Sequence, residues 1–175
     1  AIAGTFVDVF LSSYQSPPQQ IVLDLDATDD PLHGHQEGRF FHRYYDCYCY
    51  LPLYIFCDDH LLCAKLRQAN HGESRGAREE LERIVAHVRT CWPHVQILVR
   101  GDSGFSSDEL MRWCDHNDVE YVFGMARNKR LLRRLQADLD LAQRKHACTG
   151  QPVRRFKDFT CRTLKSWSRR RRIVG

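Results

Sequence analysis

Two aspartates near the start of the chain have types and spacing that could do chemistry. Asp24 and Asp26 interrupt an apolar segment that runs from Ile21 to Thr28. Because side chains alternate between the two faces of a β-strand, residues two apart point to the same side. Two carboxylates on one face repel each other unless a cation, a base or water compensates. The pair is therefore either a solvated strand end or part of a charged site.

A further aspartate follows a second apolar segment. Residues 96–101 read Gln-Ile-Leu-Val-Arg-Gly and predict a short buried strand that ends next to Asp102. Residues 103–105, Ser-Gly-Phe, then turn into the next helix. Functional side chains gather at strand ends in sheets of this type. Asp102 is thus a candidate partner for the first pair.

The elements that would position these acids follow in the order strand, strand, strand, helix, strand, helix, strand, helix. After the first strand, the expected segments are strands at 44–56, 61–66, 96–102 and 121–125, helices at 74–91 and 106–114, and a basic helix after the last strand. Pro52 predicts a bulge or a break in its strand, because proline cannot donate to the ladder. This order is that of a ribonuclease-H-like α/β fold, a mixed sheet whose first and fourth strands are neighbours. The acid near the end of the first strand and Asp102 would then lie side by side.

The composition favours a cytosolic protein with one main core. The chain has 175 residues, 43% of them hydrophobic, and its eight cysteines are scattered through apolar segments. No apolar run is long enough to cross a bilayer, so we expect reduced thiols and no membrane partner. A zinc site at Cys57, His60 and Cys63 is an alternative, although the spacing matches no standard zinc motif.

Charge is distributed unevenly along the chain. From Arg127 onward there are sixteen Lys or Arg residues and three Asp residues, a balance of +13 that leaves −9 for the preceding part. An acidic part before residue 127 and a basic part after it are typical of a metal–carboxylate centre next to a surface that binds a polyanion. In the basic part, leucines at helical spacing are expected to face inward: Leu131, Leu132, Leu135 and Leu139.

Several motifs, in order, carry a resemblance to a known family. They are residues 23–31 (LDLDATDDP), residues 33–38 (HGHQEG), residues 44–46 (YYD) with 49–53 (CYLPL), and residues 102–105 (DSGF). Together they resemble DDE transposases of the IS1380 group of bacterial insertion sequences. Arg43 and Asp58 stand where that pattern usually has glycine, and Gly101 stands at an alanine. The bulk and charge of Arg43 predict a distorted hairpin beside the tyrosine pair.

The resemblance implies the catalytic domain of an enzyme that cuts and joins DNA ends with two Mg²⁺ or Mn²⁺ ions. It implies that Asp26 and Asp102 are the first two catalytic and metal-binding carboxylates, with Asp24 a neighbour of the metal ligands. The implied partners are terminal inverted repeats and target DNA, bound by a dimer of the full-length protein in the bacterial cytoplasm. DNA contacts are expected from the basic part: Arg127, Lys129, Arg130, Arg169, Arg170, Arg171 and Arg172. His33 and His35 are either further contacts or ordinary loop residues.

The family also requires a glutamate from a later helix, beyond a mostly β insertion. The chain has no glutamate after Glu120, so the third acid is expected outside it. The expected organisation is the tail of a larger N-terminal region (1–18), an incomplete catalytic core (19–150) and the start of a β-rich basic insertion (151–175). A start at Ala1 and an end directly after a strand-like segment also predict a fragment, and the missing third acid predicts that it is inactive alone.

Two alternatives remain open. In the first, Asp138 or Asp140 supplies the third acid of a compact nuclease, although ion pairs or solvent would explain both aspartates more simply. In the second, the chain is an inert remnant whose basic part binds DNA without sequence preference.

Overall fold

The computed structural model describes residues 2–163 and 166–175. By internal contacts these residues form two units, 1–125 and 126–175. The three-part division at residues 18 and 150 stays a prediction. Among the described residues no helix is both long and apolar enough to span a membrane.

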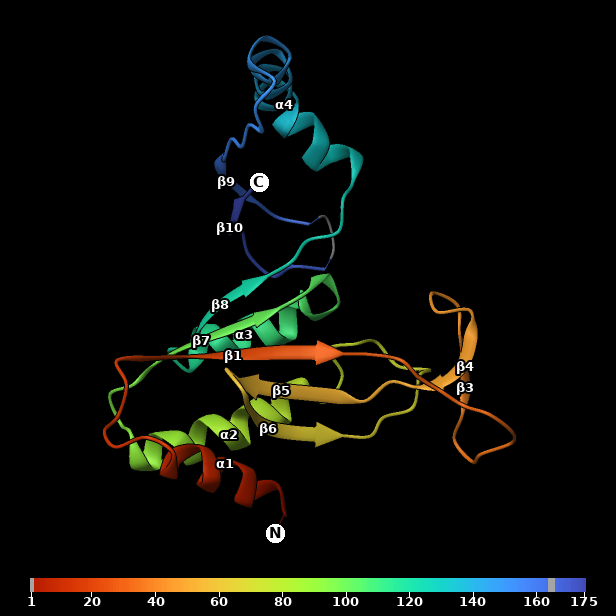
Figure 1. The fold of residues 1–175 in the computed structure, drawn as a ribbon, viewed down its shortest axis with the longest axis vertical. Coiled ribbons are helices and arrows are strands. Elements are labelled where there is room, and N and C mark those ends of the chain that lie inside the picture. Colours follow the sequence, from red (N-terminus) through yellow and green to blue (C-terminus); the bar gives the residue numbers. More distant parts are fainter. Residues whose placement is uncertain (1, 164–165) are drawn as a thin grey trace. The chain divides into compact units, whose positions relative to one another are not determined.

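A five-stranded mixed sheet forms the centre of the first unit (Figure 1). Its strands, in spatial order, are β6 (His60–Lys65), β5 (Leu53–Cys57), β1 (Gln20–Ala27), β7 (Gln96–Gly101) and β8 (Glu120–Phe123). β6, β5 and β1 form an antiparallel meander, and β7 and β8 continue it in parallel to β1. The expected ribonuclease-H-like order is confirmed, with the first and fourth strands of this sheet as neighbours.

Three helices supply the rest of this core. α1 (Ile2–Ser12) buries Val7 and Phe10, and α2 (Ala77–Cys91) buries an apolar stripe that includes Leu81 and Val88. α3 (Asp108–His116) joins β7 to β8 after a short turn, η1 (Ser103–Phe105). The stripe on α2 has the spacing of one helix face, which is why the sequence predicts it well. The helices and the sheet together hold the ends of β1 and β7 in place.

A small three-stranded sheet is inserted between β1 and β5. Its order is β2 (Asp30–Pro31), β4 (Cys47–Tyr50), β3 (Phe40–His42), and Figure 1 shows it beyond the carboxyl end of β1. The predicted break at Pro52 is confirmed, because β4 ends at Tyr50 and β5 begins at Leu53. The expectation of one meander strand from residue 44 to 56 is wrong, since β4 leaves the main sheet and pairs with β2 and β3.

Turn residues in this unit show where backbone freedom is needed. Asp58, in the turn between β5 and β6, has φ of 49°, a left-handed conformation that suits the glycine expected there. Arg43 does not distort its hairpin, because Phe41 pairs with Tyr48 and His42 with Cys47 on either side of the turn. In that turn the positive φ falls on Asp46 instead.

The second unit consists of one long helix and a two-stranded antiparallel sheet. α4 (Lys129–Thr149) begins at Asn128, whose side chain accepts hydrogen bonds from the amides of Arg130 and Leu131. β9 (Asp158–Cys161) pairs with β10 (Arg171–Val174). Each of these strands is four residues long.

The inward leucines predicted on α4 are only partly correct. Leu131 is buried and Leu135 half-buried, whereas Leu132 and Leu139 are 44% and 46% exposed. A helix of 21 residues is about 30 Å long, and strands of four residues cover only about half of it. The unit therefore cannot bury the whole apolar stripe.

Candidate active site

The register between β1 and β7 places two aspartates at the same edge of the sheet. Asp24 lies opposite Arg100 in the parallel pairing of these strands. Asp26 and Asp102 each follow two residues later, so they share the face on which Asp24 and Arg100 meet. Both are exposed. The register of β1 and β7 thus supports the predicted juxtaposition of Asp26 and Asp102. We call the edge of the sheet that carries these two residues the acid edge.

Asp24 differs from Asp26 in having a strong partner. The Arg100 guanidinium donates to both carboxylate oxygens of Asp24, from Nε to Oδ1 at 2.6 Å and from Nη2 to Oδ2 at 2.7 Å. This fork-to-fork geometry is the favoured arrangement for arginine and carboxylate. Arg100 therefore compensates one of the two acids on β1, which relieves the repulsion that made the pair costly. The carboxylate of Asp24 is thus paired with Arg100 and lies beside the edge that carries Asp26 and Asp102.

Asp102 is oriented by the turn that follows β7. Its Oδ1 accepts a hydrogen bond of 2.8 Å from the amide of Gly104, which makes Asp102 the cap of η1. The end of β8 approaches closely, because the Gly124 amide donates to the carbonyl of Gly101. A Cβ at position 124 would lie 2.9 Å from the Ser103 nitrogen. One oxygen of Asp102 is thus fixed by the turn, and the backbone around it is tightly packed.

Sequence reasoning missed a third carboxylate at this edge, Glu73 in the loop between β6 and α2. Its Oε2 lies 1.2 Å from where a Cβ on Gly104 would stand, so it covers the turn that orients Asp102. Burial raises the pKa of Glu73, and the charges of Asp102 and Asp26 raise it further. Its carboxyl group therefore lies within electrostatic reach of both acids. The sequence does not predict this contact, because the residues of the loop show no regular spacing of apolar or charged side chains.

Arg67 fixes the loop that carries Glu73. Its Nε donates to the carbonyl of Leu51 at 2.9 Å, and its Nη1 donates to the carbonyls of Glu73 and Arg75 at 2.6 and 2.7 Å. The side chain is half-buried, and this burial lowers the pKa of Arg67. The Arg67 side chain thus joins the loop to Leu51, just before β5, by hydrogen bonds to backbone carbonyls.

The donor set of this edge is made of hard oxygens. Carboxylate oxygens suit Mg²⁺ or Mn²⁺, so the chemistry of Asp26 and Asp102 fits such ions. Within residues 2–163 and 166–175, no group of three or more His, Cys, Asp or Glu side chains is arranged to hold a metal. The zinc alternative at Cys57, His60 and Cys63 is therefore wrong. Burial, and then Asp58, raise the pKa of the Cys57 thiol to about 11, which disfavours the thiolate that zinc needs.

Comparison with known proteins identifies the family. The family model described as transposase DDE domain group 1 matches residues 1–175. The chain belongs to the DDE transposases. Among solved structures, the catalytic domain of Mos1 mariner transposase is similar, with a TM-score of 0.43 and 10% identity over 88% of this chain and 73% of that one. No curated protein matches the sequence.

In this DDE transposase domain, Asp138 lies in the second unit and is held by two cations. Arg155 Nη2 and Lys157 Nζ lie 3.3 and 3.1 Å from its carboxylate oxygens. The hydrogen bond from Lys157, with that from Arg155, lowers the pKa of Asp138. Asp140 accepts a hydrogen bond from Gln136 at 2.7 Å. These contacts agree with the simpler explanation of both aspartates as surface residues with local partners.

Most of the expected DNA-contacting residues of the transposase domain are exposed in the second unit. They are Arg127, Lys129, Arg130, Arg169, Arg170 and Arg172. Arg171 is buried, with 5% of its surface exposed, and Arg172 forms an ion pair with Asp158 at 2.6 Å. Arg171 is thus the one member of the set whose side chain is turned away from solvent.

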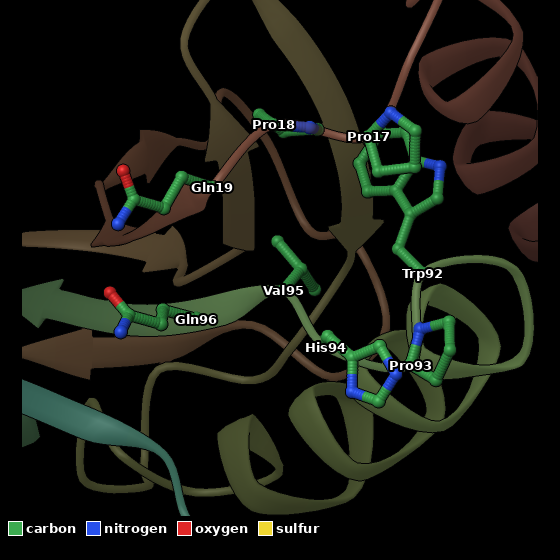
Figure 2. A pocket seen from close by; sticks show the side chains of 8 residues that line it. All are labelled: Pro17, Pro18, Gln19, Trp92, Pro93, His94, Val95 and Gln96. Atoms are coloured by element: carbon green, nitrogen blue, oxygen red, sulfur yellow. The ribbon is translucent and has the colours of Figure 1, made fainter.

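Other candidate features of the transposase domain lie away from the acids. His33 and His35 are exposed in the loop before β3, where Arg39 contacts His35 Nδ1 at 2.7 Å. Figure 2 shows a pocket at the beginning of β1 and β7. Its lining residues are Pro17, Pro18, Gln19, Trp92, Pro93, His94, Val95 and Gln96. The pocket is about 20 Å along β1 from Asp26, so it is not part of the acid edge.

Proposed function

We propose that the chain is part of the catalytic core of an IS1380-group transposase, which cleaves and joins DNA at insertion-sequence ends. The observation that carries this proposal is the β1–β7 register, which brings Asp26 and Asp102 to one edge of the sheet. The ordered motifs around both acids, from residue 23 to residue 105, support the assignment to the IS1380 group. Membership in the DDE transposases supplies the substrate class, DNA.

In the proposed reaction Asp26 and Asp102 bind divalent metal, Mg²⁺ or Mn²⁺, with two ions in the complete site. When bound, such ions would supply the acidification of the attacking water or 3′-hydroxyl and the stabilisation of the departing oxygen of the phosphodiester. The Gly104 amide keeps the Asp102 carboxylate in one orientation. Arg100 holds the Asp24 carboxylate beside the ligands and limits the negative charge that the edge carries. The protein thus contributes position and charge rather than a covalent intermediate.

The third acid of the proposed site comes from outside residues 1–175. The two cations on Asp138 support this, because a carboxylate that moved to a metal would leave Arg155 and Lys157 without their partner. We therefore expect the chain alone to cleave DNA poorly, if at all. In the same proposal residues 1–18 belong to a larger N-terminal region, 19–150 to the core, and 151–175 to the start of a basic insertion.

The exposed arginines and lysine of the second unit would contact phosphates of terminal inverted repeats and target DNA. Their charge is concentrated there, with +13 from residue 127 onward. The full-length transposase would act as a dimer in the bacterial cytoplasm, associated with the nucleoid when bound to DNA. A second candidate function, a remnant that only binds DNA, rests on the same basic unit.

A nicking assay tests the proposal. Residues 1–175 are incubated with supercoiled plasmid and Mg²⁺ or Mn²⁺, beside Asp26→Asn, Asp102→Asn and Asp138→Asn. The expected result is nicking near background in all four proteins. Robust metal-dependent nicking that Asp26→Asn and Asp138→Asn both abolish would overturn the external third acid and favour the compact nuclease.

A further inference from the structure

The small sheet β2–β4–β3 has one covered face and one open face. On the covered face Cys49 is fully buried in a cluster with Leu51 and Ala69. Because faces alternate along a strand, Tyr48 on β4 points the other way, and so does its partner Phe41 on β3. Each of these two side chains is 47% exposed.

Three flat side chains are assembled on the open face, which we call the aromatic face: Arg39, Phe41 and Tyr48. The ring centroids of Phe41 and Tyr48 are 5.4 Å apart in an edge-to-face arrangement, and Arg39 Cζ lies 4.5 Å from the Tyr48 centroid. Arg39 is itself held, because it donates to the Gly34 carbonyl and contacts His35. The three side chains are therefore already in contact before any partner arrives, which reduces the ordering cost of binding.

The location of this face ties it to the acid edge. β2 begins at Asp30, four residues after Asp26 on the same chain segment. From the turn between β3 and β4, Tyr45 packs against the cluster under the small sheet, and so does Ala27, the residue directly after Asp26. The sheet thus borders the place where a DNA strand would be cut.

The charge of the small sheet decides which part of DNA it can bind. Residues 29–50 contain four acids, Asp29, Asp30, Glu37 and Asp46, and two arginines, Arg39 and Arg43. A net charge of −2 disfavours contacts with the phosphates of a duplex. Aromatic rings and guanidinium planes, in contrast, stack with bases of any sequence once those bases are unpaired.

We propose that the aromatic face stacks unpaired bases of the DNA strand next to the acid edge, with Phe41 as its open ring and Arg39 as its charged plane. This inference rests on the proposed function, because it is the cleavage reaction that brings a DNA strand to this edge. It adds a base-contacting surface to the phosphate contacts of the second unit. Binding at the face depends weakly on salt, whereas binding at the basic unit depends on it strongly.

Fluorescence of single-stranded oligonucleotides that contain 2-aminopurine tests the proposal, because stacking quenches this base. The proteins are residues 1–175 with no change, Phe41→Ala, Phe41→Trp and Phe40→Ala. Phe40 is the matched control, since it is 38% exposed but belongs to the covered face. Phe41→Ala is expected to lose the quenching and to bind single strands about tenfold more weakly, while Phe41→Trp retains both. Binding to duplex is expected to stay unchanged in all variants.

Three outcomes would overturn the inference: quenching that survives in Phe41→Ala, an equal loss of duplex binding, or a loss of self-association without any change in DNA binding. The last would identify the face as an interface between copies of the chain. Circular dichroism of each variant checks that the fold is kept, and Phe41→Trp keeps the test decisive if Phe41→Ala unfolds. Asp26→Asn separates this test from the proposed function, because stacking is expected to persist in a variant whose metal site is removed.

Discussion

Replacement of Gly104 by alanine tests the contact that brings Glu73 to the acid edge. The new Cβ would lie 1.2 Å from Oε2 of Glu73 and 2.8 Å from its Cβ. Rotation of the carboxylate relieves the first clash but not the second, and Arg67 holds the backbone of residues 73 and 75. Overpacking of this kind costs about 1–3 kcal/mol, against which the smaller conformational freedom of alanine in the unfolded chain returns about 0.4–1 kcal/mol. We expect a net destabilisation of about 1–2 kcal/mol.

A double-mutant cycle with Glu73→Gly isolates the contact. This second change removes Oε2, Cδ and also the Cβ whose clash rotation cannot relieve, so Gly104→Ala should cost at least about 1 kcal/mol less in its presence. The free energy of unfolding of the first unit is measured in urea by fluorescence of Trp92 and Trp113 in a Trp167→Phe background, because Trp167 lies in the second unit. Additive free energies, within about 0.5 kcal/mol, would refute the placement of Glu73 over the turn.

Two further predictions concern thiols and DNA. Cys91 and Cys148 are exposed and should react with a thiol reagent in the folded protein at mildly alkaline pH, whereas Cys57 and Cys63 should not, since burial raises the pKa of each to about 11 and keeps it protonated. Mass spectrometry of the labelled peptides checks this, and early labelling of Cys57 or Cys63 would contradict the buried core around β5 and β6. Replacement of the exposed arginines among residues 169–172 by glutamine should weaken duplex binding and reduce its salt slope by about 0.9 for each phosphate that is no longer neutralised. An unchanged slope in a salt titration, with Arg78→Gln in the first unit as control, would exclude these side chains as phosphate ligands.

The sequence predicts the main sheet well because its strands and helices have regular patterns. Residues 20–27 and 96–101 are apolar runs bounded by turn signals, and α2 repeats its apolar residues at helical spacing. The topology then follows from general rules on connections between strands. This is enough to place Asp26 beside Asp102, since their positions depend only on the ends of two strands.

What the sequence does not predict depends on contacts between segments without a regular pattern. Glu73 lies in an irregular loop, and only the folded structure shows that it approaches Gly104 in the turn that orients Asp102. The sequence predicts one strand over β4 and β5, because both are rich in aromatic residues. The separate pairing of β4 with β2 depends on how residues 32–46 fold, and these residues have no regular pattern. Leu132 and Leu139 have the spacing of buried residues, but the second unit has too little surface to cover them.

Binding of Mn²⁺ tests the central claim, a metal-binding edge built by Asp26 and Asp102, most directly. Electron paramagnetic resonance measures the free ion as residues 1–175 are titrated, with Asp26→Asn, Asp102→Asn and the matched control Asp138→Asn. We predict weak binding that either of the first two variants abolishes and that Asp138→Asn leaves unchanged. Binding that survives in both Asp26→Asn and Asp102→Asn, or that disappears in Asp138→Asn, would contradict the account.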